Sequence, residues 1–134
     1  MDPIPTCRSR DIFSRPWLAF LVFWLPAIAI VAAGTQKFTG RERAITWAVA
    51  LATMGVACLV NALRCRRVHC YLTGPFFLLM AFVSLSCGLN ILPLGAYGWN
   101  LIGLTVLVGA IVLCCVPEVL LGKYRAGRTG GGDG

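Results

Sequence analysis

Residues 68–117 read VHCYLTGPFFLLMAFVSLSCGLNILPLGAYGWNLIGLTVLVGAIVLCCVP and contain no Asp, Glu, Lys or Arg in 50 positions. At 1.5 Å per residue, one helix of this length would far exceed the ~30 Å hydrocarbon core of a bilayer, so the segment must fold back. Turn-forming residues cluster at Gly74-Pro75 and at 93–98. We therefore expect two membrane-spanning helices here, with Pro75 at the first position of the earlier one.

Two shorter uncharged segments complete the pattern. Arg15 and Lys37 are separated by 21 uncharged residues, and Arg43 and Arg64 by 20, which is about the length that a spanning helix needs. Only 13% of the 134 residues are charged, whereas soluble domains carry about 25%. The sequence predicts one all-α domain over residues 16–122, an integral membrane four-helix bundle. Its expected spans lie near residues 16–34, 44–63, 75–92 and 99–116.

The first span carries two further signals. Its apolar run is longer than the core of a cleavable secretory signal, so we expect the span to be retained. Pro26 lies inside it, and a proline without an N–H should kink the helix.

Small residues at four-residue spacing, such as Ala29 with Ala33 and Thr105 with Gly109, should allow close helix packing.

The distribution of Lys and Arg predicts the orientation. With four spans, the N-terminal segment 1–15, the second loop and the tail 123–134 lie on one side, and each carries three basic residues. The first loop carries the other three and the third loop none. Nine against three places both termini in the cytoplasm of a multi-pass protein of the plasma (inner) membrane. The tail is Gly-rich and is expected to be disordered.

The composition also limits the partners. The net charge of +7 is explained by orientation and by attraction to anionic lipid headgroups, so we expect the lipid bilayer and no nucleic acid as partner. A homo-oligomer or another membrane protein is left open. Paired carboxylates, a Ser/His/Asp set, a Gly-rich phosphate loop and a CxxC motif are all missing from the sequence. We therefore predict no enzyme and no required cofactor.

Seven cysteines in 134 residues are unusual, and six of them fall on the predicted cytoplasmic side. A structural disulfide would not persist there. Metal binding, thiol chemistry and packing remain as roles. The six are Cys7, Cys58, Cys65, Cys70, Cys114 and Cys115.

The second span leads into a stripe of ligating side chains. Met54, Cys58, Asn61, Cys65 and His69 follow at spacings of four, three, four and four, and Cys70 comes next. On one continuous helix these residues would share a face. Thioether, thiolate and imidazole bind soft or borderline ions such as Cu(I), Zn(II) and Hg(II), and the neighbouring Arg side chains would favour the thiolate. The alternative is a helix-interface stripe, which we favour for Met54 and Asn61. For Cys65, His69 and Cys70 we favour the metal site.

A second constellation is the vicinal pair Cys114-Cys115. Adjacent helical residues point about 100° apart, so two such thiols do not converge on one ion in a regular helix. Pro117 cannot donate to the carbonyl of Leu113, and a loosened last turn would let both sulfurs reach a common ion. The alternative is that both cysteines are small buried hydrophobes. Glu118 would add a carboxylate to the site or would pair with an Arg of the second loop.

This layout resembles the small inner-membrane mercuric-ion transporters of bacterial mercury resistance. The resemblance rests on the four spans, on Cys114-Cys115 and on the pair Cys65 and Cys70, and it implies transfer of Hg(II) between Cys pairs toward the cytoplasm. Family members usually carry the vicinal pair on the first helix, whereas here it lies on the fourth. Residues 58–75 also resemble a segment of uncharacterised small prokaryotic membrane proteins, which implies no function.

The sequence thus favours a membrane protein that binds or transports a soft metal ion (Hg, Cu or Zn), with the ion as cargo. The expected ligands lie at the cytoplasmic face and comprise Cys58, Cys65, His69, Cys70, Cys114 and Cys115. The alternative is a non-catalytic accessory membrane protein whose cysteines are packing residues. The half of the bundle on the predicted outer side favours this alternative, because it contains few side chains that could bind a metal ion.

Overall fold

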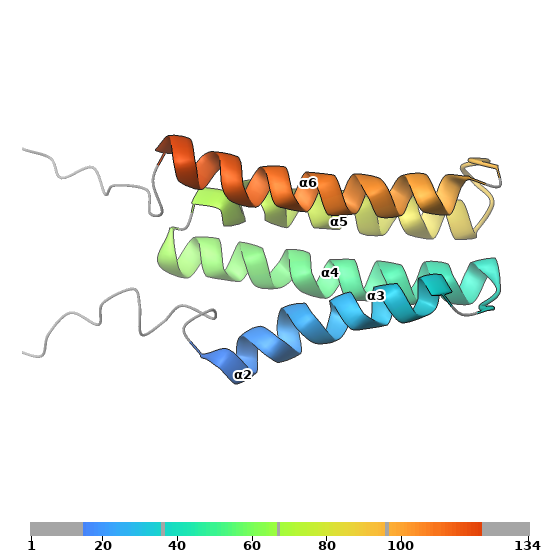
Figure 1. Cartoon of the computed structure of the whole chain (residues 1–134), viewed down its shortest axis with the longest axis horizontal. Helices are drawn as coiled ribbons and strands as arrows, with labels where there is room; N and C mark the ends of the chain where they lie inside the picture. Colours follow the sequence, from blue (N-terminus) through green and yellow to red (C-terminus); the bar gives the residue numbers. More distant parts are fainter. Residues whose placement is uncertain (1–14, 36, 67, 96, 122–134) are drawn as a thin grey trace, which may run out of the picture.

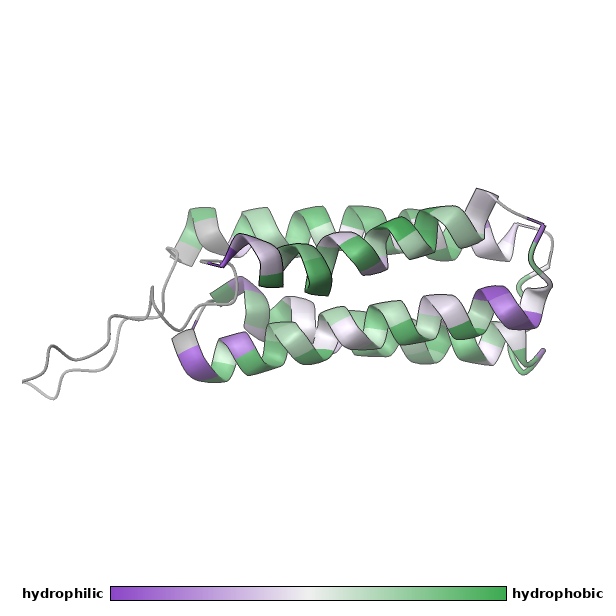
Figure 2. Ribbon diagram, turned by 90° about the horizontal axis from the view of Figure 1, so that it is seen from below, coloured by the Kyte–Doolittle hydropathy of each residue, from purple (hydrophilic) through white to green (hydrophobic). Residues whose placement is uncertain are grey.

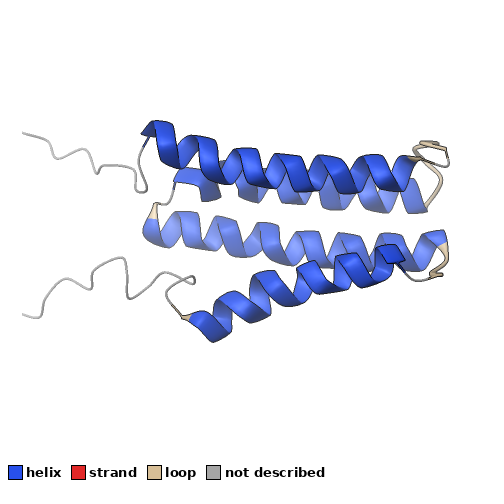
Figure 3. Cartoon of the chain, viewed as in Figure 1, coloured by secondary structure: helices blue, strands red, loops and turns tan. Residues whose placement is uncertain are grey.

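The computed structural model describes residues 15–35, 37–66, 68–95 and 97–121, and it confirms the predicted all-α bundle of four spans (Figures 1 and 3). All four spans are long and apolar enough to cross a bilayer. The first comprises α2 (Pro16–Ala19), the π-helix η2 (Phe20–Trp24) and α3 (Leu25–Thr35), and the others are α4 (Gly40–Cys65), α5 (Val68–Gly88) and α6 (Gly98–Leu121). The predictions for residues 1–14 and 123–134, including Cys7 and the tail, lie outside the described residues.

The antiparallel pair of α4 and α5 forms the centre of the bundle. These two helices share the most extensive interface, α6 packs on α5, and α3 packs on α4. Figure 2 shows hydrophilic residues gathered near the ends of the helices and hydrophobic residues along their length. Large apolar side chains such as Leu79, Phe82 and Leu107 are exposed on the outside, as lipid-facing residues would be. We call the two ends of the bundle the α3–α4 end and the α4–α5 end. Which end faces the cytoplasm stays a prediction.

A π-helical turn precedes Pro26 in the first span. Pro26 has no N–H, and just before it the backbone N–H of Leu25 donates to the carbonyl of Phe20, a π-type bond at the end of η2. Sequence reasoning expected a kink at this proline but not the π-helix.

Helix α4 has clear start and stop signals. Thr39 and Glu42 form a capping box, in which Thr39 Oγ1 accepts from the Glu42 N–H at 3.3 Å and Glu42 Oε2 accepts from the Thr39 N–H at 3.1 Å. At the other end Arg66 has the left-handed conformation (φ 51°), and its N–H donates to the Ala62 carbonyl. This stop reverses the chain into α5 after two residues.

The predicted start of the third span at Pro75 is wrong. Helix α5 begins at Val68, and Pro75 lies inside it with its ring exposed. The interface with α4 explains the difference. A Cβ atom on Gly74 would lie 2.8 Å from Leu59, and one on Gly55 would lie 3.0 Å from the Gly74 carbonyl oxygen. This close backbone approach holds the first turns of α5 against α4 despite the hydrogen bond that Pro75 cannot make.

Helix α6 likewise continues past its proline. Pro117 lies inside the helix, which extends to Leu121, so Cys114 and Cys115 do not lie in its last turn as predicted. Loosening of the helix at Pro117 stays a prediction. A proline removes one backbone hydrogen bond and need not end a helix that has neighbours to pack on. Gly109 in the same helix lies directly against the ring of Phe76 on α5, in agreement with the small-residue spacing.

Candidate functional site

Two cysteine thiols meet inside the α4–α5 interface. Cys58 lies on α4 and Cys70 in the first turn of α5, and the turn at Arg66 brings them face to face. Both side chains belong to the same buried cluster, and their thiols are close enough to interact with each other. Cys58 is 2% and Cys70 0% exposed, so this pair is fully enclosed near the α4–α5 end. We call Cys58 and Cys70 the thiol pair.

Two polar side chains contact the thiol pair. Nε2 of His69 lies 3.2 Å from Sγ of Cys70, and Nδ2 of Asn61 donates to the same sulfur at 3.9 Å. His69 and Asn61 are both buried. Thr73, one turn further along α5, donates from its Oγ1 to the carbonyl of His69 at 2.7 Å. Cys70 therefore lies at the centre of a small polar cluster within an apolar interface.

The predicted single-helix stripe is wrong as a structure, because α4 ends at Cys65 and His69 belongs to α5. The chain reversal nevertheless brings Cys58, Asn61 and Cys70 together. The side chain of Cys65 lies outside the described residues, as does that of Glu118. Met54 packs against the apolar core.

The vicinal cysteines of α6 occupy different environments. Cys114 is half-buried and close enough to Cys58 to interact with it electrostatically, whereas Cys115 is exposed. Cys115 lines a shallow apolar depression with Val116, Val119 and Leu120. On the continuous helix, Cys114 thus faces the bundle near the thiol pair, and Cys115 faces outward.

The number of ligands limits which ion the site could hold. Among the residues that the structure describes, no group of three or more His, Cys, Asp or Glu side chains is arranged to hold a metal ion. A structural zinc site takes four such ligands. The thiol pair offers two sulfurs, which suits soft ions of low coordination number such as Cu(I) and Hg(II).

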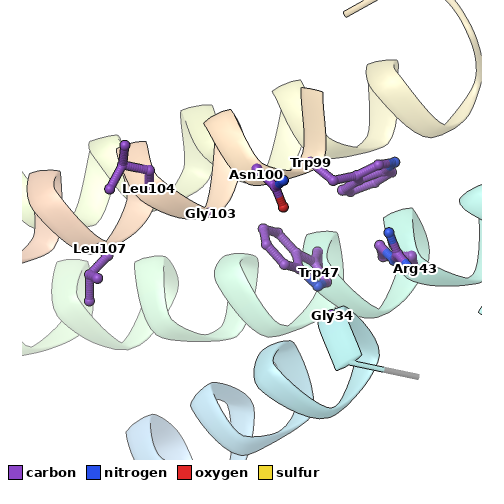
Figure 4. A pocket seen from close by; sticks show the side chains of 8 residues that line it. All are labelled: Gly34, Arg43, Trp47, Trp99, Asn100, Gly103, Leu104 and Leu107. Atoms are coloured by element: carbon purple, nitrogen blue, oxygen red, sulfur yellow. The ribbon is translucent and has the colours of Figure 1, made fainter. Parts of the chain in front are cut away.

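A second feature, which sequence reasoning missed, is a pocket at the α3–α4 end lined by Arg43, Trp47, Trp99 and Asn100 among others (Figure 4). Its signal in the sequence is one basic and two aromatic residues at predicted span ends, but Arg43 and Trp99 are far apart in the chain.

Comparison with known proteins gives no relative: no protein-family model, curated protein or solved structure matches the sequence significantly. The arguments about function therefore rest on the residues themselves.

Proposed function

We propose that this small multi-pass membrane protein binds a soft metal ion between Cys58 and Cys70. The observation that carries the proposal is that two thiols from two different helices are buried in one cluster, close enough to interact, with an imidazole nitrogen 3.2 Å from one of the sulfurs. Thiolates are the preferred ligands of Cu(I) and other soft ions. The ion would replace the protons of both thiols. Hg(II) would compensate the charges of both thiolates, whereas Cu(I) would compensate one of them and leave one net negative charge.

The surroundings of the thiol pair fit this role. His69 and Asn61 contact the Cys70 sulfur, and nitrogen donors next to a ligating sulfur orient it and tune its affinity. Cys114, on α6, is close enough to Cys58 on α4 to interact with it electrostatically. It offers a further sulfur to which an ion could pass.

The proposed role is to hold the ion at the α4–α5 end and to release it there, on the side that the charge distribution predicts to be cytoplasmic. Movement of the ion across the whole bilayer is a further part of the proposal. The mercuric-ion transporters that the chain resembles in layout move their ion toward that side.

The alternative is an accessory membrane protein in which the thiol pair only fills the interface. The scarcity of ligands favours it, since the described residues show two cooperating thiols rather than a complete metal site. Cysteine is a small residue suited to tight packing, and Asn61 would serve as an interhelical hydrogen-bond donor.

Anaerobic competition with a Cu(I) chelator separates the two roles. The purified, reduced protein should take up about one Cu(I), and Cys58→Ser and Cys70→Ser should each lose most of the affinity, because a hydroxyl is a poor ligand for soft ions. Cys87→Ser is the matched control, since Cys87 lies on α5 away from the thiol pair. If the Cu(I) affinity is unchanged in the double variant Cys58→Ser/Cys70→Ser, the thiol pair does not bind the ion and only its packing role remains.

The same variants can be tested in cells. If the thiol pair handles metal, cells that produce the wild type and cells that produce Cys58→Ser/Cys70→Ser should differ in their sensitivity to Cu and Hg(II). Equal sensitivity together with unchanged affinity in vitro would remove a metal function of the thiol pair.

A further inference from the structure

The pocket at the α3–α4 end has a cationic wall. It has a volume of about 330 Å³ and lies between α3, α4 and α6. Nε of Arg43 donates to the carbonyl of Ala33 at 3.1 Å, and the guanidinium carbon lies 5.6 Å from the ring centroid of Trp99. These two contacts hold the Arg43 side chain between the end of α3 and the start of α6, where it lines the pocket (Figure 4).

Aromatic rings and glycines shape the same pocket. Trp47 and Trp99 pack edge to face with their centroids 5.7 Å apart. The Trp47 ring lies between two helices that have no side chain at this point: a Cβ atom on Gly34 would be 3.9 Å, and one on Gly103 3.2 Å, from its six-membered ring. Trp47 thus forms the floor of a gap between α3 and α6.

The electrostatics of this end favour an anion. Helices α4 and α6 both begin here, and a helix N-terminus carries partial positive charge. The loop and first turn before Ala44 contain Lys37, Arg41 and Arg43 against the single acid Glu42. The carboxylate of Glu42 caps the Thr39 N–H. Asn100 adds an amide in the first turn of α6, on the wall of the pocket.

An apolar groove continues from this pocket toward the bilayer centre. It has a volume of about 410 Å³, shares Gly34, Trp47 and Gly103 with the pocket, and is lined further along by side chains such as Ile30 and Val106. The groove follows the gap between α3 and α6, which pack on α4 and α5 rather than closely on each other. A cationic pocket that opens into an apolar groove matches an anionic head joined to a hydrocarbon chain.

We infer that the pocket and the groove bind one anionic phospholipid, with its phosphate at Arg43 and Asn100 and one acyl chain between α3 and α6. Charge complementarity selects the head, and the groove selects a ligand with a chain. Trp47 lines both the pocket and the groove, so the two spaces are continuous along its ring.

Native mass spectrometry of the full chain in a neutral detergent tests the inference. The probes are phosphatidylglycerol, phosphatidylcholine and diacylglycerol with identical chains, and inorganic phosphate as competitor. Phosphatidylglycerol should bind at one site, and Arg43→Gln should weaken it by about tenfold or more, since hydrogen bonds to charged groups are strong. Arg41→Gln is the matched control, because Arg41 is exposed and does not line the pocket.

Two further variants test the chain-binding part. Gly34→Leu would project into the gap from a position where a Cβ atom makes only ordinary contact, and it should also weaken phosphatidylglycerol. Ile28→Phe, on an exposed part of α3 outside the groove, should not. Asn100→Leu provides a second headgroup variant if circular dichroism shows that Arg43→Gln does not fold.

Three results would overturn the inference. Equal retention of the three lipids would mean general bilayer contact. Equal losses in Arg43→Gln and Arg41→Gln would mean diffuse surface attraction. Displacement of phosphatidylglycerol by millimolar phosphate, with no effect of Gly34→Leu, would mean a site for a free anion.

Discussion

Replacement of Gly55 by Ala should push α4 and α5 apart and destabilise the bundle. The added Cβ atom would lie 2.9 Å from Cγ of Leu78 and 3.0 Å from the carbonyl oxygen of Gly74. The Leu78 side chain can rotate, but the Gly74 oxygen belongs to the backbone and moves only if the helices separate by a few tenths of an ångström. Such overpacking costs about 1–3 kcal/mol. The better helix propensity of Ala returns up to about 1 kcal/mol, so we expect a net loss of up to about 2 kcal/mol.

Reversible unfolding in mixed micelles, followed by circular dichroism, would measure this loss. Gly40→Ala is the matched control, because it introduces the same methyl group into the same helix at a position with nothing within 4 Å. Gly40→Ala should leave the free energy of unfolding unchanged or slightly raised. If Gly55→Ala proves as stable as Gly40→Ala, the close approach of α4 and α5 is not what holds the bundle together.

Four other predictions use accessibility and pH. In detergent, maleimide should label the exposed Cys115 quickly and Cys58 and Cys70 only after unfolding; fast labelling of either buried thiol would contradict the enclosed pair. Because α6 runs through Pro117, Pro117→Ala should leave labelling of Cys115 unchanged, whereas a marked slowing would show that the proline loosens the wild-type helix. Cu(I) affinity should fall as the pH decreases, since protons compete for the thiolates, and an affinity independent of pH would exclude them as ligands. Lys37→Cys should be labelled from outside intact cells, and protection there would reverse the predicted orientation.

The number of spans was predictable because it depends on composition. Charged side chains are costly in a bilayer, so the long uncharged gaps between Arg15, Arg43, Arg67 and their next charged neighbours marked four helices. Helix ends were less predictable. Pro75 and Pro117 are local signals, and both were overridden by packing between helices that the sequence does not display.

The thiol pair was predictable only in part. Cys58, Asn61 and Cys70 stood out by residue type and spacing, but their contact depends on the reversal at Arg66, a non-glycine residue with positive φ. No sequence signal required a left-handed residue there. The pocket around Arg43 and Trp99 depends on the relative placement of α3, α4 and α6, and no spacing rule along the chain connects these residues.

X-ray absorption spectroscopy of the Cu(I)-loaded protein tests the central claim most directly, because it identifies the atoms bound to the ion. We expect sulfur ligation in the wild type, loss of one sulfur ligand in Cys58→Ser and in Cys70→Ser, and an unchanged spectrum in Cys115→Ser. A spectrum that is unaffected by Cys58→Ser and Cys70→Ser, or that loses sulfur only in Cys115→Ser, would contradict a metal site at the thiol pair.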